Sequence, residues 1–485
     1  MIKRIISVLV SLFLLSAFVA VLGCSKEKTS VAASDAKNTV DTSDPLNPNL
    51  EAIDYEQYTF KILTHDTSQF LADETAVGVV NQAVYERNLE IMEKYNIKFE
   101  TYEVAQSSAA YLDKVKTSVN AGDDAYDALT PSVSYAFTLA FNELLTEFCE
   151  IPHINVDKAY WWDNVLKDTS IAGKNYFAVS DANSKSFTEM ALVMFNKELV
   201  KEYNIENLYD LALDGKWTID KMMTLAKSVY DDLDGDSQYS VNDQYGLTGN
   251  SYMTDCFLYG MDTLFIPKDD DDIPYFAVEN DERFLSFFTK VREFFNDKST
   301  LYGEYQTGAN ARQTVPQAAF QEGRVLFWVE SMGWVATMRD IDIDFGLLPM
   351  PKAEETQKRY SNFLHAWTSS AMAVPLTSEE RLDLVGRILE DMAYYSHLKI
   401  RPAYYDVFLT GVLTRDEESA AMLPYIIDNC RIDFAMVFRT SGLTFMDDLR
   451  TIASNPSMQI TSQIARKLNT YKNIISNLSG KISDN

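Results

Sequence analysis

The stretch Tyr58-Thr59-Phe60-Lys61-Ile62-Leu63 decides the fold that the sequence predicts. Its Tyr, Phe and Ile side chains alternate with other residues at the period of a β-strand. Residues 80–95 then show the apolar spacing of a helix, and the stretch 97–102 returns to alternation. Strand, helix, strand is the βαβ unit of an α/β domain with a parallel sheet.

The same kind of pattern continues along the chain. A helix is predicted over 109–119 and a strand over 126–129. Thr218 is placed to cap a later helix, with Trp217 and Met222 at the positions of a hydrophobic staple. Thr377 and Glu380 fit a capping box for another helix. The predicted fold class is therefore α/β.

The N-terminus has the features of an export signal. Lys3 and Arg4 precede an apolar run from Ile5 to Leu22, and Gly23 and Cys24 follow it. These are the parts of a secretory signal, and the cysteine after the small residue resembles the lipobox of bacterial lipoproteins. That resemblance implies a signal peptide over 1–23 and a diacylglyceryl group on Cys24. The alternative is an uncleaved membrane helix, because the run reaches the lower limit of spanning length.

Residues 25–50 are mostly Ser, Thr, Asp, Asn and Ala, with few large apolar groups. Such a segment buries too little to offset the entropy of ordering. We therefore expect 24–50 to be a lipidated flexible tether. The rest of the chain is expected outside the cytoplasm, held at the cell membrane by the lipid, at the cell surface or in a periplasm.

Composition limits the partners. The 485-residue chain has a formal net charge of -28, which repels phosphates, so nucleic acid and anionic lipid headgroups are poor ligands for it. Beyond Cys24 only Cys149, Cys256 and Cys430 remain, so no disulfide framework is implied. Stability is expected to come from packing, with a structural metal as a candidate addition.

Several motifs, in order, resemble the extracellular solute-binding proteins of bacterial ABC importers, of the large family 1 type that serves carbohydrate uptake. The resemblance covers about residues 58–440. The motifs are Tyr126-Asp127, Trp161-Trp162, Gly173-Lys174-Asn175-Tyr176, Met194-Phe195-Asn196-Lys197-Glu198-Leu199, Gly215-Lys216-Trp217-Thr218, Phe320-Gln321-Glu322-Gly323-Arg324-Val325-Leu326-Phe327, Phe345-Gly346-Leu347-Leu348-Pro349-Met350-Pro351-Lys352 and Pro402-Ala403-Tyr404-Tyr405.

The resemblance implies a two-lobed, type II periplasmic-binding-protein-like fold, with the ligand in a cleft between lobes joined by crossing segments. The N-terminal lobe would comprise 51–181 plus 352–398, and the C-terminal lobe 185–350 plus 400–485. The crossings are expected near Ala178 to Ser184, Phe345 to Lys352 and Lys399 to Tyr405. The expected function is capture of a carbohydrate, an oligosaccharide above all, by lobe closure and its delivery to an ABC permease. The expected state is a monomer, with no contact to membrane beyond the lipid.

Sugars need flat aromatic platforms and planar hydrogen-bonding groups. Trp334 follows the strand 325–329, where related sugar binders carry a cleft tryptophan, and Trp367 follows the second expected crossing. Trp162 and Trp328 are further candidates, with burial in the core as the alternative for any aromatic residue. The polar candidates lie after predicted strands or on the first crossing, where turn capping and solvated surface are the alternatives. They are His65, Asp66, Tyr135, Asp181, Asn183 and Glu330.

An acidic loop has the spacing of a calcium site. Asp232, Asp234, Asp236, Gln238 and Asp243 stand at positions 1, 3, 5, 7 and 12 of an EF-hand loop. Two departures weaken the match, because position 6 is not glycine and position 12 is Asp instead of Glu. A structural Ca²⁺ is the hypothesis, an ordinary acidic loop the alternative, and no cofactor is expected for the function itself.

Two other functions stay open. A surface glycoside hydrolase needs only two carboxylates at a suitable separation, and a sensory or adhesive lipoprotein could use the same fold. The sequence shows no HExxH zinc motif, no GxSxG elbow and no glycine-rich phosphate loop. We therefore do not expect an enzyme.

Overall fold

The computed structural model describes residues 44–72, 74–75, 77–105, 109–236, 240–338, 341–411 and 417–483. The chain divides into Met1–Pro45 and Leu46–Asn485, and the second unit contains all the elements below. The predicted signal peptide, Cys24 and most of the tether lie outside the described residues. Within the described part of the chain, no helix has both the length and the apolar character that a membrane span requires.

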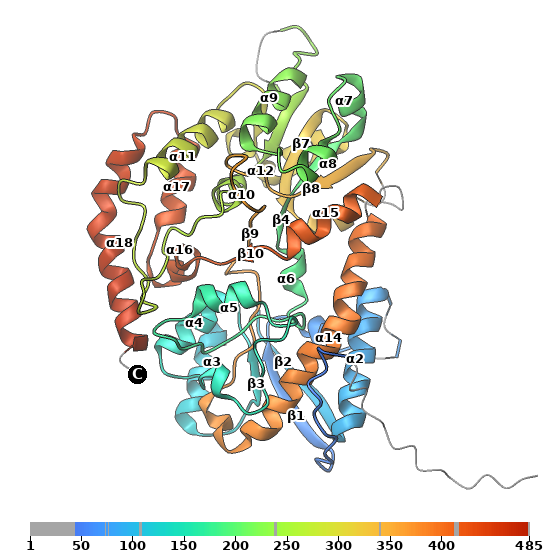
Figure 1. Ribbon diagram of the computed structural model, residues 1–485, viewed down its shortest axis with the longest axis vertical. Helices are drawn as coiled ribbons and strands as arrows, with labels where there is room; N and C mark the ends of the chain where they lie inside the picture. Colours follow the sequence, from blue (N-terminus) through green and yellow to red (C-terminus); the bar gives the residue numbers. More distant parts are fainter. Residues whose placement is uncertain are drawn as a thin grey trace, which may run out of the picture. The chain divides into compact units, whose positions relative to one another are not determined.

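The first sheet contains three parallel strands in the order β2-β1-β3 (Figure 1). Helix α2 connects β1 to β2, and α3 connects β2 to β3, so the predicted βαβ unit is confirmed. The bounds are β1 Tyr58–Thr64, η1 Thr67–Gln69, α2 Val79–Tyr95, β2 Ile97–Glu103, α3 Ala109–Ala121 and β3 Ala128–Thr130.

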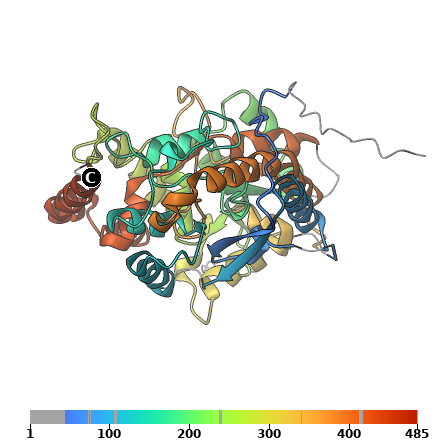
Figure 2. The same ribbon diagram turned by 90° about the horizontal axis from the view of Figure 1, so that it is seen from below.

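Both faces of this sheet are covered, as parallel sheets require. Phe60 and Ile62 point to one face and pack with Ile91 of α2 and Val385 of α14. Leu63 points to the opposite face, where it packs in the same cluster as Tyr111 of α3. Figure 2 shows the blue strands with α3 in dark teal on one side and α14 in orange on the other. This lobe also contains α4 Val133–Phe141, η2 Phe148–Glu150 and α5 Asp163–Thr169.

The second sheet contains five strands in the order β6-β5-β7-β4-β8. Strand β5 runs parallel to β6 and β7, whereas β4 runs antiparallel to β7 and β8. Because β5 and β7 are parallel, their carboxyl ends meet at one edge of the sheet. The bounds are β4 Ala191–Asn196, β5 Tyr245–Gly249, β6 Thr300–Tyr302, β7 Val325–Ser331 and β8 Phe345–Leu348.

Helices pack around this second sheet. Thr218 caps α9 through its side-chain oxygen, which accepts from the Lys221 amide at 3.3 Å, as predicted. Trp217 before it is fully buried and donates its indole N–H to the Pro349 carbonyl at 2.9 Å. The bounds are α7 Lys197–Glu202, α8 Leu208–Leu213, α9 Ile219–Val229, α10 Tyr252–Gly260, α11 Glu282–Phe295, η3 Gly303–Tyr305, α12 Ala311–Gln321, α13 Gly333–Thr337, α15 Glu417–Ile427, α16 Phe434–Val437, η5 Phe438–Ser441, α17 Phe445–Ala453 and α18 Ile460–Ser483.

In the described part of the chain, three segments pass between the lobes. The first leads through residues 180–184 into α6, Lys185–Thr188. The second leaves the second lobe through β9, Asn362–Phe363, which pairs with β10, Cys430–Arg431, and Ser370 then bridges to Ser132 of the first lobe. This passage lies further along the chain than the expected 345–352, because β8 and Lys352 are still hydrogen-bonded within the second lobe.

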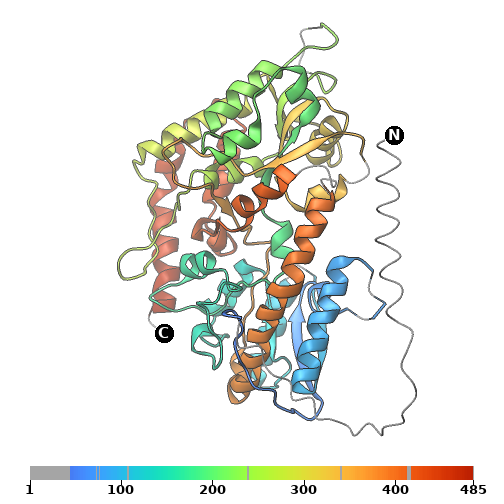
Figure 3. The same ribbon diagram turned by 45° about the vertical axis from the view of Figure 1, so that its right-hand side comes forward.

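The third passage is helix α14, Leu382–Gly411, which runs unbroken from one lobe to the other (Figures 1 and 3). The expected crossing at 399–405 is thus an internal part of a 30-residue helix. The predicted capping box is not formed. A 3-10 turn, η4 Leu376–Arg381, occupies that position, and the buried Thr377 hydroxyl has no hydrogen-bond partner among the described residues.

Candidate functional site

A pocket of about 440 Å³ opens where β5 and β7 end, and we call it the cleft. Its lining includes two predicted contacts, Glu330 and Trp334. It also includes Glu189 beyond the first passage, Tyr252 at the start of α10, and His365 on the second passage. Ligands of α/β proteins bind at the carboxyl ends of strands, so this position suits a binding site.

Glu330 is the most unusual group in the cleft. It is 6% exposed, and burial raises the pKa of its carboxyl to about 7. One oxygen accepts from Gln313 Nε2 at 3.1 Å and the other from the Ser331 amide at 3.1 Å. Gln313 is held in turn by Asn250 Nδ2, which donates to its Oε1 at 2.7 Å. The cleft thus presents a carboxyl and two amides in fixed orientations.

Glu189 and His365 are also desolvated. Burial raises the pKa of the Glu189 carboxyl. Burial, followed by the charges of Arg450 and Arg439, lowers the pKa of His365 to about 3, so its imidazole is neutral at physiological pH. Its Nδ1 lies 3.1 Å from Thr368 Oγ1. A neutral imidazole donates one hydrogen bond and accepts one, which matches a hydroxyl group.

Carboxylates of the second lobe compensate two of the arginines that line the cleft, Arg439 and Arg450. Arg450 Nε lies 3.1 Å from both oxygens of the fully buried Asp255, and its Nη1 lies 3.0 Å from Asp447. Arg439 Nε donates to the other Asp447 oxygen at 2.8 Å. The Arg439 guanidinium lies over the Trp367 ring, 5.6 Å from its centroid.

From Trp367 a row of rings leads into the first lobe. The Trp367 and Tyr135 centroids are 6.1 Å apart, Tyr135 and Tyr111 are 6.5 Å apart, and Tyr111 and His65 are 5.4 Å apart. Three of these four residues, all but Tyr111, were predicted contacts. The structure brings them together because the ends of β1 and β3 meet the second passage at the same edge of the sheet.

The first lobe adds buried polar groups without partners. Neither ring nitrogen of His65 has a hydrogen-bond partner among the described residues, and burial lowers its pKa to about 4. The hydroxyls of Thr130, Ser134 and Ser369 share this condition within the described chain. Buried polar groups are normally satisfied, so these atoms represent unused hydrogen-bonding capacity in the first lobe.

Two predicted contacts have structural positions instead. Trp328 is 1% exposed and packs between Phe320 and Trp334, with ring centroids 5.5 and 5.9 Å away, so it supports the Trp334 ring from behind. Asp66 caps the turn η1 by accepting from the Ser68 amide at 3.0 Å.

Asp181, Asn183 and Trp162 secure the first passage. The fully buried Asp181 accepts from the Trp162 indole N–H at 2.9 Å and lies 2.6 Å from His397 Nδ1. Asn183 Nδ2 donates to Ser370 Oγ at 3.2 Å and so joins the first passage to the second. None of the three is among the described residues that line the cleft.

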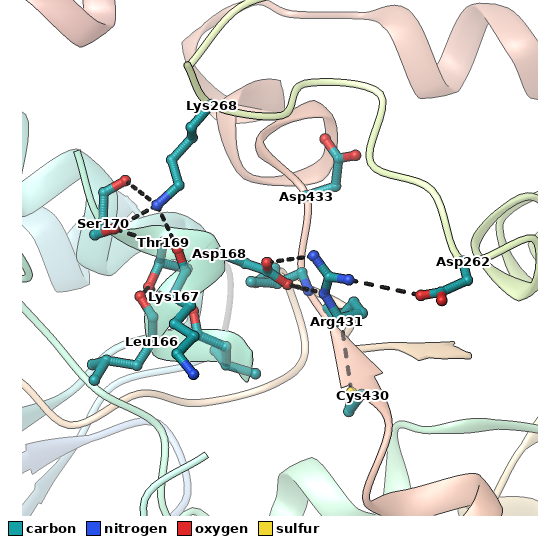
Figure 4. A network of polar contacts seen from close by, with 12 residues as sticks. Leu166, Lys167, Asp168, Thr169, Ser170, Asp262, Lys268, Cys430, Arg431 and Asp433 are labelled. Atoms are coloured by element: carbon teal, nitrogen blue, oxygen red, sulfur yellow. Dashed lines mark hydrogen bonds and ion pairs between the residues drawn. The ribbon is translucent and has the colours of Figure 1, made fainter. Parts of the chain in front are cut away.

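A polar network joins the lobes beside α5 (Figure 4). Arg431 of β10 donates to both oxygens of Asp168, from Nε at 2.6 Å and from Nη2 at 2.7 Å. The Arg431 Nη1 lies 3.7 Å from Asp262. Lys268 reaches the end of α5, where its Nζ donates to the Ser170 carbonyl at 3.3 Å.

The acidic loop brings three of its predicted ligands together. Carboxylate oxygens of Asp232, Asp234 and Asp236 lie within 4.8 Å of one another. Asp243 is fully buried; one oxygen accepts from the Ser240 amide at 3.1 Å, and Oδ1 has no partner among the described residues. Gln238 lies outside the described residues. Hard oxygen donors of this kind fit Ca²⁺.

Sequence reasoning missed several cleft residues, above all Tyr252, Gln313, His365 and Arg439. Asn250 and Tyr252 directly follow β5, so the rule that loops after strands carry ligands would have found them. Arg439 and Gln313 gave no such signal, because neither lies at the end of a strand.

No protein-family model and no curated protein matches this chain. Solved structures do match. The sugar-binding protein MalE from Xanthomonas citri has a TM-score of 0.60 at 12% identity, over 86% of this chain and 98% of that one. The ABC substrate-binding protein Lmo0181 from Listeria monocytogenes, in complex with cycloalternan, has a TM-score of 0.51 at 12% identity, over 88% and 99%.

The chain has the fold of a two-lobed solute-binding protein. The fold class predicted from sequence is thereby confirmed. A third match is UgpB from Mycobacterium tuberculosis in complex with glycerophosphocholine, with a TM-score of 0.55 at 13% identity over 87% of this chain and 98% of that one. Cycloalternan and glycerophosphocholine are chemically different ligands, so the two-lobed fold does not by itself name a solute.

Proposed function

We propose that the protein is an extracytoplasmic solute-binding protein that captures a carbohydrate between its lobes and delivers it to an ABC permease. The observation that carries the proposal is the cleft itself, in which Trp334 accompanies fixed amides, a buried carboxyl and a neutral imidazole, with Trp367 behind it against Arg439. Aromatic faces and planar polar groups are what a sugar ring requires.

The ligand would contact both lobes. The second lobe contributes Glu330 and Trp334, which line the cleft, and the first lobe would contribute the ring row, which begins at Trp367 beside the lining residue Arg439. A ligand that binds one arrangement of the lobes more tightly shifts the population toward it by that difference in affinity. Lobe closure would then report occupancy to the permease.

The proposal is tested by thermal unfolding of the purified mature chain with panels of oligosaccharides, amino acids and peptides. A sugar at a hundredfold excess over its Kd should add about 2.7 kcal/mol to the free energy of unfolding. Stabilisation by amino acids or peptides alone would contradict a carbohydrate ligand. Trp334→Ala serves as the matched variant and should lose most of the sugar-dependent shift.

One observation favours a hydrolase as second candidate. The cleft contains two carboxyls with raised pKa values, the half-buried Glu189 and the buried Glu330, and a raised pKa is a property of general acids. The sugar that stabilises the protein is therefore incubated with it and then recovered. Intact sugar supports binding alone, and cleaved sugar supports the hydrolase.

We also propose the lipid anchor at Cys24 on its signal-like sequence context. Mass spectrometry of protein from bacterial membranes should show a chain that begins at Cys24 and carries a diacylglyceryl group. Cys24→Ala should release the protein from the membrane fraction. An unchanged membrane fraction with an intact N-terminus would instead support an uncleaved helix.

The calcium site is a separate proposal. It is supported by the grouped oxygens of Asp232, Asp234 and Asp236. Addition of a chelator should lower the Tm of the wild type. Asp234→Ala should abolish that sensitivity, whereas Asp270→Ala in the other acidic loop should preserve it. A Tm that does not respond to chelator would overturn the site.

A further inference from the structure

A second pocket, of about 380 Å³, lies between the lobes beside α14. Ala159 and residues 161–164 of the first lobe line one side, and residues 427, 428 and 430 of the second lobe line the other. His397 and Arg401 of α14 complete the lining. We call it the hinge pocket. No residue lines both this pocket and the cleft among the described residues.

The first passage separates the two pockets. The Trp162 ring of the hinge pocket packs edge-on against Phe187 of α6, with centroids 5.5 Å apart, and Phe187 is fully buried. Two residues later Glu189 lines the cleft. A ligand in one pocket therefore does not reach the other.

The hinge pocket has an apolar floor and a polar rim. Trp161, Ile427 and Cys430 are at most 4% exposed and form the floor, and the half-buried Trp162 forms a flat wall. The rim carries one amide, one imidazole, one guanidinium and two carboxylates. They belong to Asn164, His397, Arg401, Asp163 and Asp428.

These groups are held in place before a ligand arrives. The Trp162 indole N–H donates to the buried Asp181 at 2.9 Å, which fixes the plane of the ring. Arg401 Nη2 donates to Tyr405 Oη at 3.0 Å, and the guanidinium lies 5.5 Å from the Tyr405 ring centroid. Groups that are already ordered lower the entropic cost of binding.

The charges of the rim argue for a neutral ligand. Arg401 already pairs with Asp428 and approaches Asp181 at 3.5 Å, and Asp163 pairs with Lys167 at 2.6 Å. Neither an anion nor a cation would therefore find an uncompensated partner. A neutral ring with several hydroxyls would stack on the aromatic wall, and its hydroxyls would meet both hydrogen-bond donors and hydrogen-bond acceptors.

We propose that the hinge pocket is a second binding site, which takes one neutral sugar ring against the Trp162 indole. Its volume lies within the range of small-molecule sites. The site is independent of the proposed function, because its residues are distinct from those of the cleft.

The test uses full mature protein labelled with 5-fluorotryptophan. The six tryptophans give six fluorine resonances, assigned with single Trp→Phe variants. The probes are glucose, galactose, mannose, xylose and N-acetylglucosamine. We expect at least one of them to shift the Trp162 resonance with a saturable dependence. If none of the five does so, the proposal is overturned, whatever the Trp334 resonance shows.

Two variants distinguish sugar binding in the hinge pocket from a change at Trp162 that sugar binding in the cleft causes indirectly. Asn164→Ala removes a rim amide and should weaken the response at Trp162 about tenfold while sparing Trp334. Gln313→Ala in the cleft should leave the Trp162 response unchanged. If Gln313→Ala abolishes the Trp162 response, or Asn164→Ala leaves it unaltered, the hinge pocket is not the binding site. Loss of sugar binding at Trp334 alone would instead count against the proposed function.

Discussion

Two buried carboxylates are paired with arginines on the α5 and α14 side of the passages between the lobes, whereas two buried ionisable groups on the cleft side form no ion pair with a described residue. On the side of α5 and α14, Asp168 and Asp181 each lie against an arginine. On the cleft side, Glu330 has only neutral hydrogen-bond donors, and the nitrogens of His65 have no partner among the described residues. Pairing stabilises the folded chain, whereas unpaired buried groups leave binding capacity for a ligand. Substitutions on the two sides should therefore affect different measurements.

The largest loss of stability is expected from Asp168→Ala. It removes two hydrogen bonds from Arg431 and leaves that guanidinium largely buried without its main partner. We expect a decrease of about 3 kcal/mol in the free energy of unfolding, measured in urea. Asp163→Ala on the same helix is the control, because its exposed pair with Lys167 should contribute less than about 0.5 kcal/mol. Equal decreases in the free energy of unfolding of the two variants would contradict a stabilising role of the Asp168–Arg431 pair.

Glu330→Gln should have the opposite effect on stability. The folded-state pKa of Glu330 is about 7, above the usual 4.5, so the folded chain keeps a proton that the unfolded chain has lost between these values. Wild-type stability therefore falls, relative to the variant, as pH rises from 4.5 to 7, by about 3 kcal/mol in all, and is then level. Denaturation curves at several pH values measure the difference. A difference independent of pH would show that the carboxyl is not desolvated.

Trp334→Ala should leave stability nearly intact and weaken the sugar found by screening. A half-buried ring that stacks on a ligand contributes about 2 kcal/mol, or roughly thirtyfold in Kd by titration calorimetry. Trp217→Ala is the contrast, because that fully buried ring packs in the core and its loss should reduce stability instead. Unchanged sugar affinity in Trp334→Ala would contradict the proposal that the sugar binds in the cleft.

The smallest effect is expected from Asp428→Asn. Its carboxylate is half exposed and pairs with Arg401, which also approaches Asp181. We expect less than about 1 kcal/mol of lost stability, and less still at high salt, because exposed pairs are screened. A larger loss would mean that this pair, and not Asp181, secures the first passage.

The first lobe was more predictable from the sequence than the second. Alternation from Tyr58 to Leu63 and the helical spacing of 80–95 are local signals, and the βαβ rule converts them into a parallel sheet. The second sheet is built differently. Its β4 is buried along its whole length and runs antiparallel to β7, which lies far along the chain. A continuous apolar run does not show strand direction.

The site was predictable where it follows strand ends and unpredictable where it depends on long-range approach. Glu330 lies near the end of β7, and Trp334, His65 and Tyr135 come after strands; Trp367 and Arg439 connect the two pairs. Asp181 was expected at the ligand as well, but it contacts His397 and Arg401 of α14, a helix that begins 201 residues later (382 minus 181), and it holds Trp162 beside it. No local sequence pattern predicts that contact between Asp181 and α14.

Helix α14 also has a mechanical consequence. Its 30 residues measure ~45 Å as a continuous rod, which is stiff everywhere that its ladder of hydrogen bonds is complete. Pro402 lies inside it and lacks the N–H that would bond to the Leu398 carbonyl. The hydrogen-bond ladder of α14 therefore lacks one bond at this turn, which lies between His397 and Tyr405. We therefore expect α14 to bend most readily at this turn when one lobe moves against the other.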